Sequence, residues 1–190
     1  MPDLKGKTVM ITGAAGNLGR ATADAFDFAG ANLVLVDLNG DALETTYPGN
    51  ENHRIKCAVD LMVPAAIEAA VAQGRDKFGQ INALAAIAGG FHMGETVHGL
   101  PADKWDLMMD LNARTLLNTT AAVVPGMIDN NSGKIVTIGA NAARQGMANM
   151  GAYIAAKGAV IRLTETMSAE LRSKGVNVNC VMPSIIDTPE

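Results

Sequence analysis

The sequence is poor in cysteine, in charge and in long apolar runs, and each shortage excludes a class of protein. Two cysteines, Cys57 and Cys180, in 190 residues cannot build a disulfide framework. Neither has CxxC spacing, so we expect reduced, buried thiols. The formal net charge of −4 gives no electrostatic reason to expect nucleic acid as a partner. No apolar run reaches the roughly 18 residues of a membrane span, so we expect no membrane partner.

Targeting and metal-binding signals are also missing. The first residues, MPDLKGKTVM, pass from a short polar lead into an apolar run without the regions of a signal peptide. We therefore expect the cytoplasm, as the default compartment. His53, His92 and His98 are scattered without a partner at ligand or triad spacing, so we expect solvated or loop histidines and no metal site.

What the sequence has is a regular alternation of apolar runs and helical patterns, with 48% hydrophobic residues overall. The predicted strands are residues 7–12, 31–36, 55–59, 81–88, 134–138 and 176–182. The predicted helices are residues 18–28, 64–78, 102–127 and 151–173. Apolar strands separated by long helices indicate a parallel sheet buried on both faces. The prediction is one α/β domain over residues 1–190, with a doubly wound parallel sheet.

A glycine-rich turn follows the first predicted strand and opens the first helix. Residues 12–19 read TGAAGNLG. Glycines let the backbone approach a pyrophosphate, and the helix N-terminus offers unpaired N–H groups and a positive dipole end. This context predicts a dinucleotide site. A tight strand-to-helix turn that binds no ligand is the alternative. The residues expected against the cofactor are Gly13, Ala15, Asn17, Leu18 and Gly19.

Asp37 ends the second predicted strand, about 18 residues beyond Gly19. An acidic residue about 20 residues after the loop can accept hydrogen bonds from the adenosine ribose. Its charge repels a 2′-phosphate, and no lysine or arginine stands beside it in VLVDLNG. The prediction is therefore NAD, with NADP less favoured. The alternative is that Asp37 caps the helix of the segment that follows.

Together with the glycine loop and Asp37, three further motifs make the chain resemble the short-chain dehydrogenase/reductase family from end to end. YIAAK, from Tyr153 to Lys157, is similar to the family's YxxxK motif, and Asn112 in DLNAR is similar to its helix asparagine. Residues 183–188, PSIIDT, resemble the PGxxxT segment, with Ser184 in place of glycine. The resemblance implies a Rossmann fold and an NAD(P)-dependent oxidoreductase acting on a small molecule.

The resemblance also implies roles for individual residues. Tyr153 would be the acid/base, and Asn112 would hold a water that links Lys157 to solvent. A free tyrosine has a pKa of about 10, and we expect the ammonium of Lys157, one helical turn away, to lower it while Lys157 also reaches the nicotinamide ribose. Further cofactor contacts are implied at Asp60 and the adjoining Leu61, at Ala88 and Gly89 of the AIAG segment, and at Pro183, Ile186 and Thr188.

The departures from the family pattern leave three functions open. Ala140 stands where the family has its catalytic serine, and Asn17 stands at a usual glycine. The segments AGGF, IGANAA and IDTP also resemble the quinonoid dihydropteridine reductase branch. The leading expectation is hydride transfer with a small alcohol or ketone. The others are reduction of a C=N bond of the dihydropterin kind, and an NAD-binding protein without catalysis.

The family resemblance carries two expectations about the whole protein. In the family, the two long helices that carry Asn112 and Tyr153 form the subunit interface, which implies a homodimer or homotetramer. The family also adds a helix and a strand after the sixth strand. We therefore expect the complete protein to continue beyond Glu190.

Overall fold

The apolar runs form the six strands of one parallel sheet, in a computed structural model that describes residues 3–187. The strands are β1 (Thr8–Thr12), β2 (Asn32–Asp37), β3 (Arg54–Ala58), β4 (Ala83–Ala86), β5 (Gly133–Ile138) and β6 (Val176–Val181). Their order is β3-β2-β1-β4-β5-β6, and every neighbouring pair is parallel. The strand order reverses between β1 and β4, as in a Rossmann fold. The predicted fold class is confirmed.

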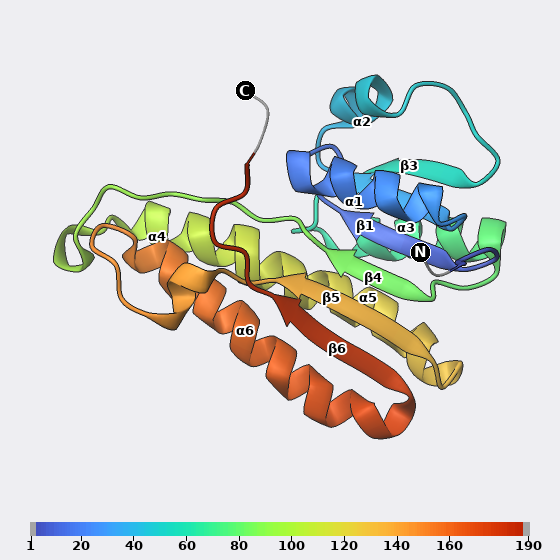
Figure 1. The fold of residues 1–190 in the computed structure, drawn as a ribbon. Coiled ribbons are helices and arrows are strands. Elements are labelled where there is room, and N and C mark those ends of the chain that lie inside the picture. The colour runs from blue at the N-terminus through green and yellow to red at the C-terminus, as the bar shows by residue number, and fades with distance from the viewer. Residues whose placement is uncertain (1–2, 188–190) are drawn as a thin grey trace.

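Helices connect the strands and cover the sheet (Figure 1). The helices are α1 (Asn17–Phe28), α2 (Gly40–Thr46), α3 (Pro64–Phe78), α4 (Ala102–Met109), α5 (Thr115–Asp129) and α6 (Gly151–Leu171). Short 3-10 turns lie at Val97–Gly99, Asn141–Arg144 and Arg172–Lys174. Parallel neighbours require such crossover connections, so the helices follow from the strand order.

Two apolar cores lie on the two faces of the sheet. The larger core joins α3, α5 and the end of α6 to strands from β1 to β6, around residues such as Ile67, Val123 and Ile135. The smaller core joins α1 and α2 to β1, β2 and β4, around Ile11 and Leu35. Helices cover both faces of the central strands. A ligand can therefore bind at the end of the sheet where the carboxyl ends of these strands meet.

The structure corrects four expectations. Gly40–Thr46 forms a helix that was not predicted, and the predicted helix over residues 102–127 is interrupted by a π-helical segment, Asp110–Arg114. β5 and β6 are buried on one face only, and Val136 and Val181 are exposed on the other, because α1 and α2 cover only the β1–β3 side. Of the two thiols expected to be buried, Cys57 is buried but Cys180 is partly exposed.

Candidate active site

A cleft of about 690 Å³ runs along the carboxyl edge of the sheet, from the ends of β2 and β3 to α6. It brings together most of the residues predicted to bind a cofactor or to react. The predicted residues that line it are Gly13, Asn17, Leu18, Gly19, Asp37, Asp60, Leu61, Ala88, Gly89, Tyr153, Lys157 and Ile186. Ala15, Asn112 and Pro183 are not among its lining residues, and Thr188 lies outside the described residues.

The glycine loop has the shape that an anion site requires. Gly13 has a φ of +68°, and a Cβ on Gly19 would lie 2.0 Å from the Gly13 carbonyl oxygen, so no larger residue fits at Gly19. α1 begins with Gly16 as its N-cap, without a side-chain cap and without an acidic residue in its first turn. The N–H groups of that turn are therefore free for an anion, which the helix dipole also favours.

Two side chains that sequence reasoning missed hold this loop in place. The buried Tyr47 hydroxyl donates a hydrogen bond to the Ala14 carbonyl at 2.7 Å, and the Thr12 hydroxyl accepts from the amides of Ile87 and Ala88 at 3.1 and 3.2 Å. Burial, and then the Asp24 carboxylate, raises the pKa of Tyr47 to about 12, so Tyr47 stays a neutral donor. No local sequence motif predicts either contact, because each contact joins segments that are far apart in the chain.

Asp37 faces the cleft at the end of β2. Its Oδ2 accepts a hydrogen bond from the Ala15 amide at 3.0 Å, and its Oδ1 accepts from the Asn39 amide at 3.1 Å. Each carboxylate oxygen retains a lone pair for a ligand. The alternative in which Asp37 caps the next helix is wrong, because Asn39 is the N-cap of α2 and accepts from the Ala42 amide.

Asp60 follows β3 and lines the same end of the cleft. Its Oδ1 accepts a hydrogen bond from the Met62 amide at 2.8 Å. The neighbouring Leu61 is buried, and its carbonyl accepts from the Asn118 side chain at 2.9 Å. These hydrogen bonds hold the turn after β3 in place, and the Asp60 carboxylate lies on the side of the turn that lines the cleft.

Tyr153 and Lys157 lie one turn apart on α6, and both line the cleft. Lys157 is 6% exposed, and its Nζ donates to the Ile138 carbonyl at 2.8 Å. Burial lowers the pKa of Lys157 to about 8, partly opposed by Cys180. Burial raises the pKa of Tyr153, because burial disfavours the charged phenolate, and this direction is opposite to the lowering expected from Lys157.

Phe91 is a second aromatic residue at this end of the cleft that sequence reasoning missed. Its ring meets the Tyr153 ring edge to face, with the centroids 4.9 Å apart and an angle of 81° between the planes. Such a contact is a favoured aromatic geometry. The one available signal was an aromatic residue directly after AGG in a chain with 4% aromatics.

Asn112 lies in the π-helical segment and is 2% exposed. Its side-chain amide donates to the carbonyls of Gly90 and Met108, and its Oδ1 accepts from the Gly90 amide. A Cβ on Gly89 would lie 2.7 Å from Asn112 Oδ1 and 3.2 Å from Lys157 Nζ, so Gly89 passes between these two groups. Asn112 thus positions the backbone at residues 89–90 beside Lys157.

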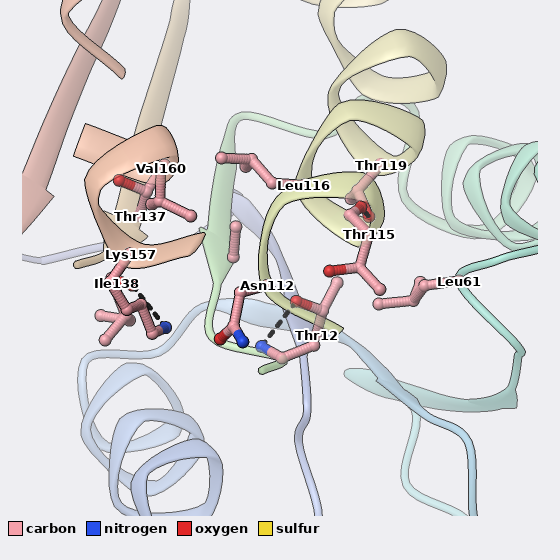
Figure 2. Close-up of a pocket in the computed structure, with 12 residues that line it drawn as sticks. Thr12, Leu61, Asn112, Thr115, Leu116, Thr119, Thr137, Ile138, Lys157 and Val160 are labelled. Carbon is pink, nitrogen blue, oxygen red and sulfur yellow. Dashed lines mark hydrogen bonds between the residues drawn. The ribbon is translucent and has the colours of Figure 1, made fainter. Parts of the chain in front are cut away.

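A small internal cavity lies beneath this point, and Figure 2 shows the residues around it. Its volume is about 10 Å³, close to what one water molecule needs. Lys157, Asn112 and the hydroxyl-bearing Thr12, Thr115 and Thr137 are among its lining residues. The space is consistent with the expected water between Asn112 and Lys157.

No cluster of metal-ligating side chains is present among residues 3–187. Over the same residues, no helix is long and apolar enough to cross a membrane. Ala140, which follows β5 and precedes the 3-10 turn Asn141–Arg144, is 5% exposed and places a methyl group at the position where a serine was expected from the resemblance.

Comparison with known proteins identifies the relatives of this chain. The family model for short chain dehydrogenases matches residues 7–190. A sorbitol dehydrogenase of Cereibacter sphaeroides is 34% identical over 185 residues, which are 97% of this chain and 72% of the relative.

Solved structures agree with the sequence relatives. A 3-ketoacyl-(acyl-carrier-protein) reductase from Brucella melitensis, complexed with NADH, has a TM-score of 0.91 at 26% identity, over 97% of this chain and 78% of that one. An NAD+-bound xylitol dehydrogenase has a TM-score of 0.90 at 32% identity, over 95% of this chain and 71% of that one. With a Rossmann sheet, a glycine loop and a YxxxK helix, the chain belongs to the short-chain dehydrogenase/reductase family of NAD(P)-dependent oxidoreductases.

Proposed function

We propose that this chain transfers a hydride between NAD(H) and a small alcohol or ketone, with Tyr153 as the general acid/base. The observation that carries the proposal is that a single cleft is lined by the glycine loop, by Asp37 and by the Tyr153–Lys157 pair. Among the described residues that line the cleft, Tyr153 and Lys157 are the one pair that combines a phenol with a buried ammonium.

The residues of the cleft fit a dinucleotide. The uncapped first turn of α1 and the close approach of Gly13 and Gly19 suit a pyrophosphate. The nicotinamide cofactor would supply the hydride. The residues proposed to hold the cofactor are Gly13, Ala15, Asn17, Leu18, Gly19, Asp37, Asp60, Leu61, Ala88, Gly89, Tyr153, Lys157, Pro183, Ile186 and Thr188. Ala15 and Pro183 would act indirectly, because the Ala15 N–H donates to Asp37 and so orients its carboxylate, and the Pro183 carbonyl accepts from the Asn141 amide and so positions the segment after β6.

Asp37 is the basis for proposing NAD rather than NADP. Its carboxylate is held by two backbone amides at the cleft surface, and Asp60 adds a second carboxylate at the same end. Lys157 is the one cationic side chain among the described residues that line the cleft, and it lies at the other end. A 2′-phosphate next to Asp37 would therefore meet like charge without a compensating cation among the described lining residues at this end.

Residues of the chain itself would carry the proton to or from the substrate oxygen. The Tyr153 hydroxyl would donate its proton to the oxygen of a ketone during reduction and would accept one from an alcohol during oxidation. Lys157, with a pKa of about 8, is mostly protonated at neutral pH and would favour the phenolate form as the proton leaves. Asn112 would hold the backbone at Gly90, and the cavity beside it gives room for a water through which Lys157 exchanges protons.

A C=N acceptor of the dihydropterin kind is a second candidate. The observation in its favour is the buried methyl group of Ala140, which offers no second donor to a developing alkoxide. A conjugated ring that spreads the developing charge needs such a donor less.

We also propose a homodimer or homotetramer formed through the helices that carry Asn112 and Tyr153. Trp105, Leu107 and Leu117 support it, because these large apolar side chains on α4 and α5 are more than 40% exposed. Light scattering after size-exclusion chromatography tests it, and a monomer at micromolar concentration would contradict it.

The direct test of the proposed function uses NADH deuterated at C4 of the nicotinamide, with 4-methylcyclohexanone as the probe. We expect one deuterium at the carbinol carbon of the product, detected by mass spectrometry. Cofactor binding without deuterium transfer to this ketone or to quinonoid dihydropterin would favour an NAD-binding protein without catalysis.

A further inference from the structure

The two ends of the cleft differ in chemistry. The end at β2 and β3 carries the carboxylates of Asp37 and Asp60. The end at Tyr153 is lined by apolar side chains from four separate segments: Phe91, Leu111, Ile138 and Ile186. Phe91 is 57% exposed and Ile186 is 44% exposed, so both present apolar surface that residues 3–187 leave uncovered.

Two of the polar residues at the Tyr153 end, Gly90 and Thr115, are already engaged within the protein. The amide and the carbonyl of Gly90 both pair with the Asn112 side chain, at 3.2 and 3.1 Å. The Thr115 hydroxyl donates to the Leu111 carbonyl at 2.8 Å. Tyr153 is therefore the one side-chain hydroxyl at this end, among the described lining residues, without a partner in the protein.

Phe91 lies against Tyr153 on a loop that is hydrogen-bonded to the segment before α6. The edge-to-face contact joins the two rings, and the Gly94 amide donates to the Asn149 carbonyl at 2.9 Å, which ties this loop to the segment before α6. The adjacent His92 pairs with Glu95 through its Nε2. A carbonyl oxygen that receives the Tyr153 proton thus has the Phe91 ring as its neighbour.

We propose that this site selects substrates whose reacting carbon belongs to an apolar ring, and that Phe91 is the residue that makes the selection. The inference rests on the proposed function and narrows its substrate class. It separates this chain from enzymes that act on open-chain polyols, because a substrate hydroxyl placed against the Phe91 ring would lose water without gaining a hydrogen bond from that side chain. An apolar pocket discriminates against one added hydroxyl by a factor of up to about 100.

The experiment measures ligand binding to the enzyme–NADH complex, in which an alcohol cannot react. The probes are 4-methylcyclohexanol and cyclohexane-1,4-diol, which share the ring and the reacting carbinol and differ in a methyl or a hydroxyl group. NADH fluorescence reports the two dissociation constants. We expect the methyl compound to bind at least about tenfold tighter than the diol.

Variants test whether Phe91 causes the preference for the methyl compound over the diol. Phe91→Ala should bring the ratio of the two dissociation constants close to one, mainly through weaker binding of the methyl compound, while the affinity for NADH is kept. Phe91→Leu, which restores apolar volume, should recover part of the ratio. Phe28→Ala is the matched control, because Phe28 is 82% exposed at the end of α1 and does not line the cleft, and it should change neither constant.

Equal or tighter binding of the diol, or a ratio unchanged in Phe91→Ala, would overturn this inference and leave the proposed function standing. Failure of both alcohols to bind the NADH complex would also overturn it. Failure of NADH itself to bind would overturn the proposed function, and this inference would fall with it.

Discussion

Burial of Lys157 should lower the stability of the folded protein by an amount that depends on pH. Lys157 is 6% exposed, and its Nζ has one hydrogen bond, to the Ile138 carbonyl. Its pKa falls from 10.5 to about 8 on folding, mainly through burial. A difference of about 2.5 units corresponds to about 3 kcal/mol of unfolding free energy.

The sign follows from which state binds the proton. Below pH 8 both states carry it, so the full cost of burying the charge is present. Between about pH 8 and 10.5 the folded state has released the proton while the unfolded state keeps it, so the unfolding free energy rises with pH. Above this window both states are neutral and the cost has disappeared.

Lys157→Met isolates this effect because it keeps the aliphatic stem and removes the titration. Urea unfolding at pH 7.5, 8.5, 9.5 and 10.5 gives the free energy of unfolding for both proteins, and subtraction cancels the other titrating groups. We expect the variant's advantage over the wild type to shrink by about 3 kcal/mol across the series. Lys174→Met, at an exposed position, should show no such trend. A wild-type-to-variant difference that is flat or grows with pH would refute the reasoning.

Three further predictions concern the cofactor, the loop and the reacting centre. NADH should bind at least tenfold tighter than NADPH, about 1.4 kcal/mol; fluorescence titration should show that Asp37→Asn reduces this preference and that the exposed Asp41→Asn does not. Tyr47→Phe should lower the unfolding free energy by about 1–3 kcal/mol in urea, because the Ala14 carbonyl loses its buried donor; an unchanged value would contradict the role given to Tyr47. Ala140→Ser should leave or raise kcat/KM on 4-methylcyclohexanone and bring no gain on quinonoid dihydropterin; loss on the ketone would contradict the ketone assignment.

The sheet could be predicted because its information is local. Thr8–Thr12 and Asn32–Asp37 are short apolar runs bounded by turn residues, and burial of these strands follows directly from their composition. The glycine loop could be predicted for the same reason, since a strand, a glycine turn and a helix follow one another without interruption. The spacing of Asp37 from that loop then placed it at the correct edge.

The remainder depends on contacts between distant segments. α2 is seven residues long and mostly polar, and it is held by the burial of Leu43 and of Tyr47 at its end, which no periodicity reveals. The π-helical segment Asp110–Arg114 is a shift in backbone hydrogen bonding that leaves the side-chain pattern helical. The direction of the Tyr153 pKa shift depends on burial and so requires the three-dimensional structure.

The most direct test of the central claim is turnover by Tyr153→Phe. The substitution removes the hydroxyl that transfers the proton and keeps the ring that packs against Phe91. Ketone-dependent oxidation of NADH should be lost, while fluorescence titration should give an NADH affinity close to that of the wild type. Wild-type rates in Tyr153→Phe on the same ketone would contradict the account.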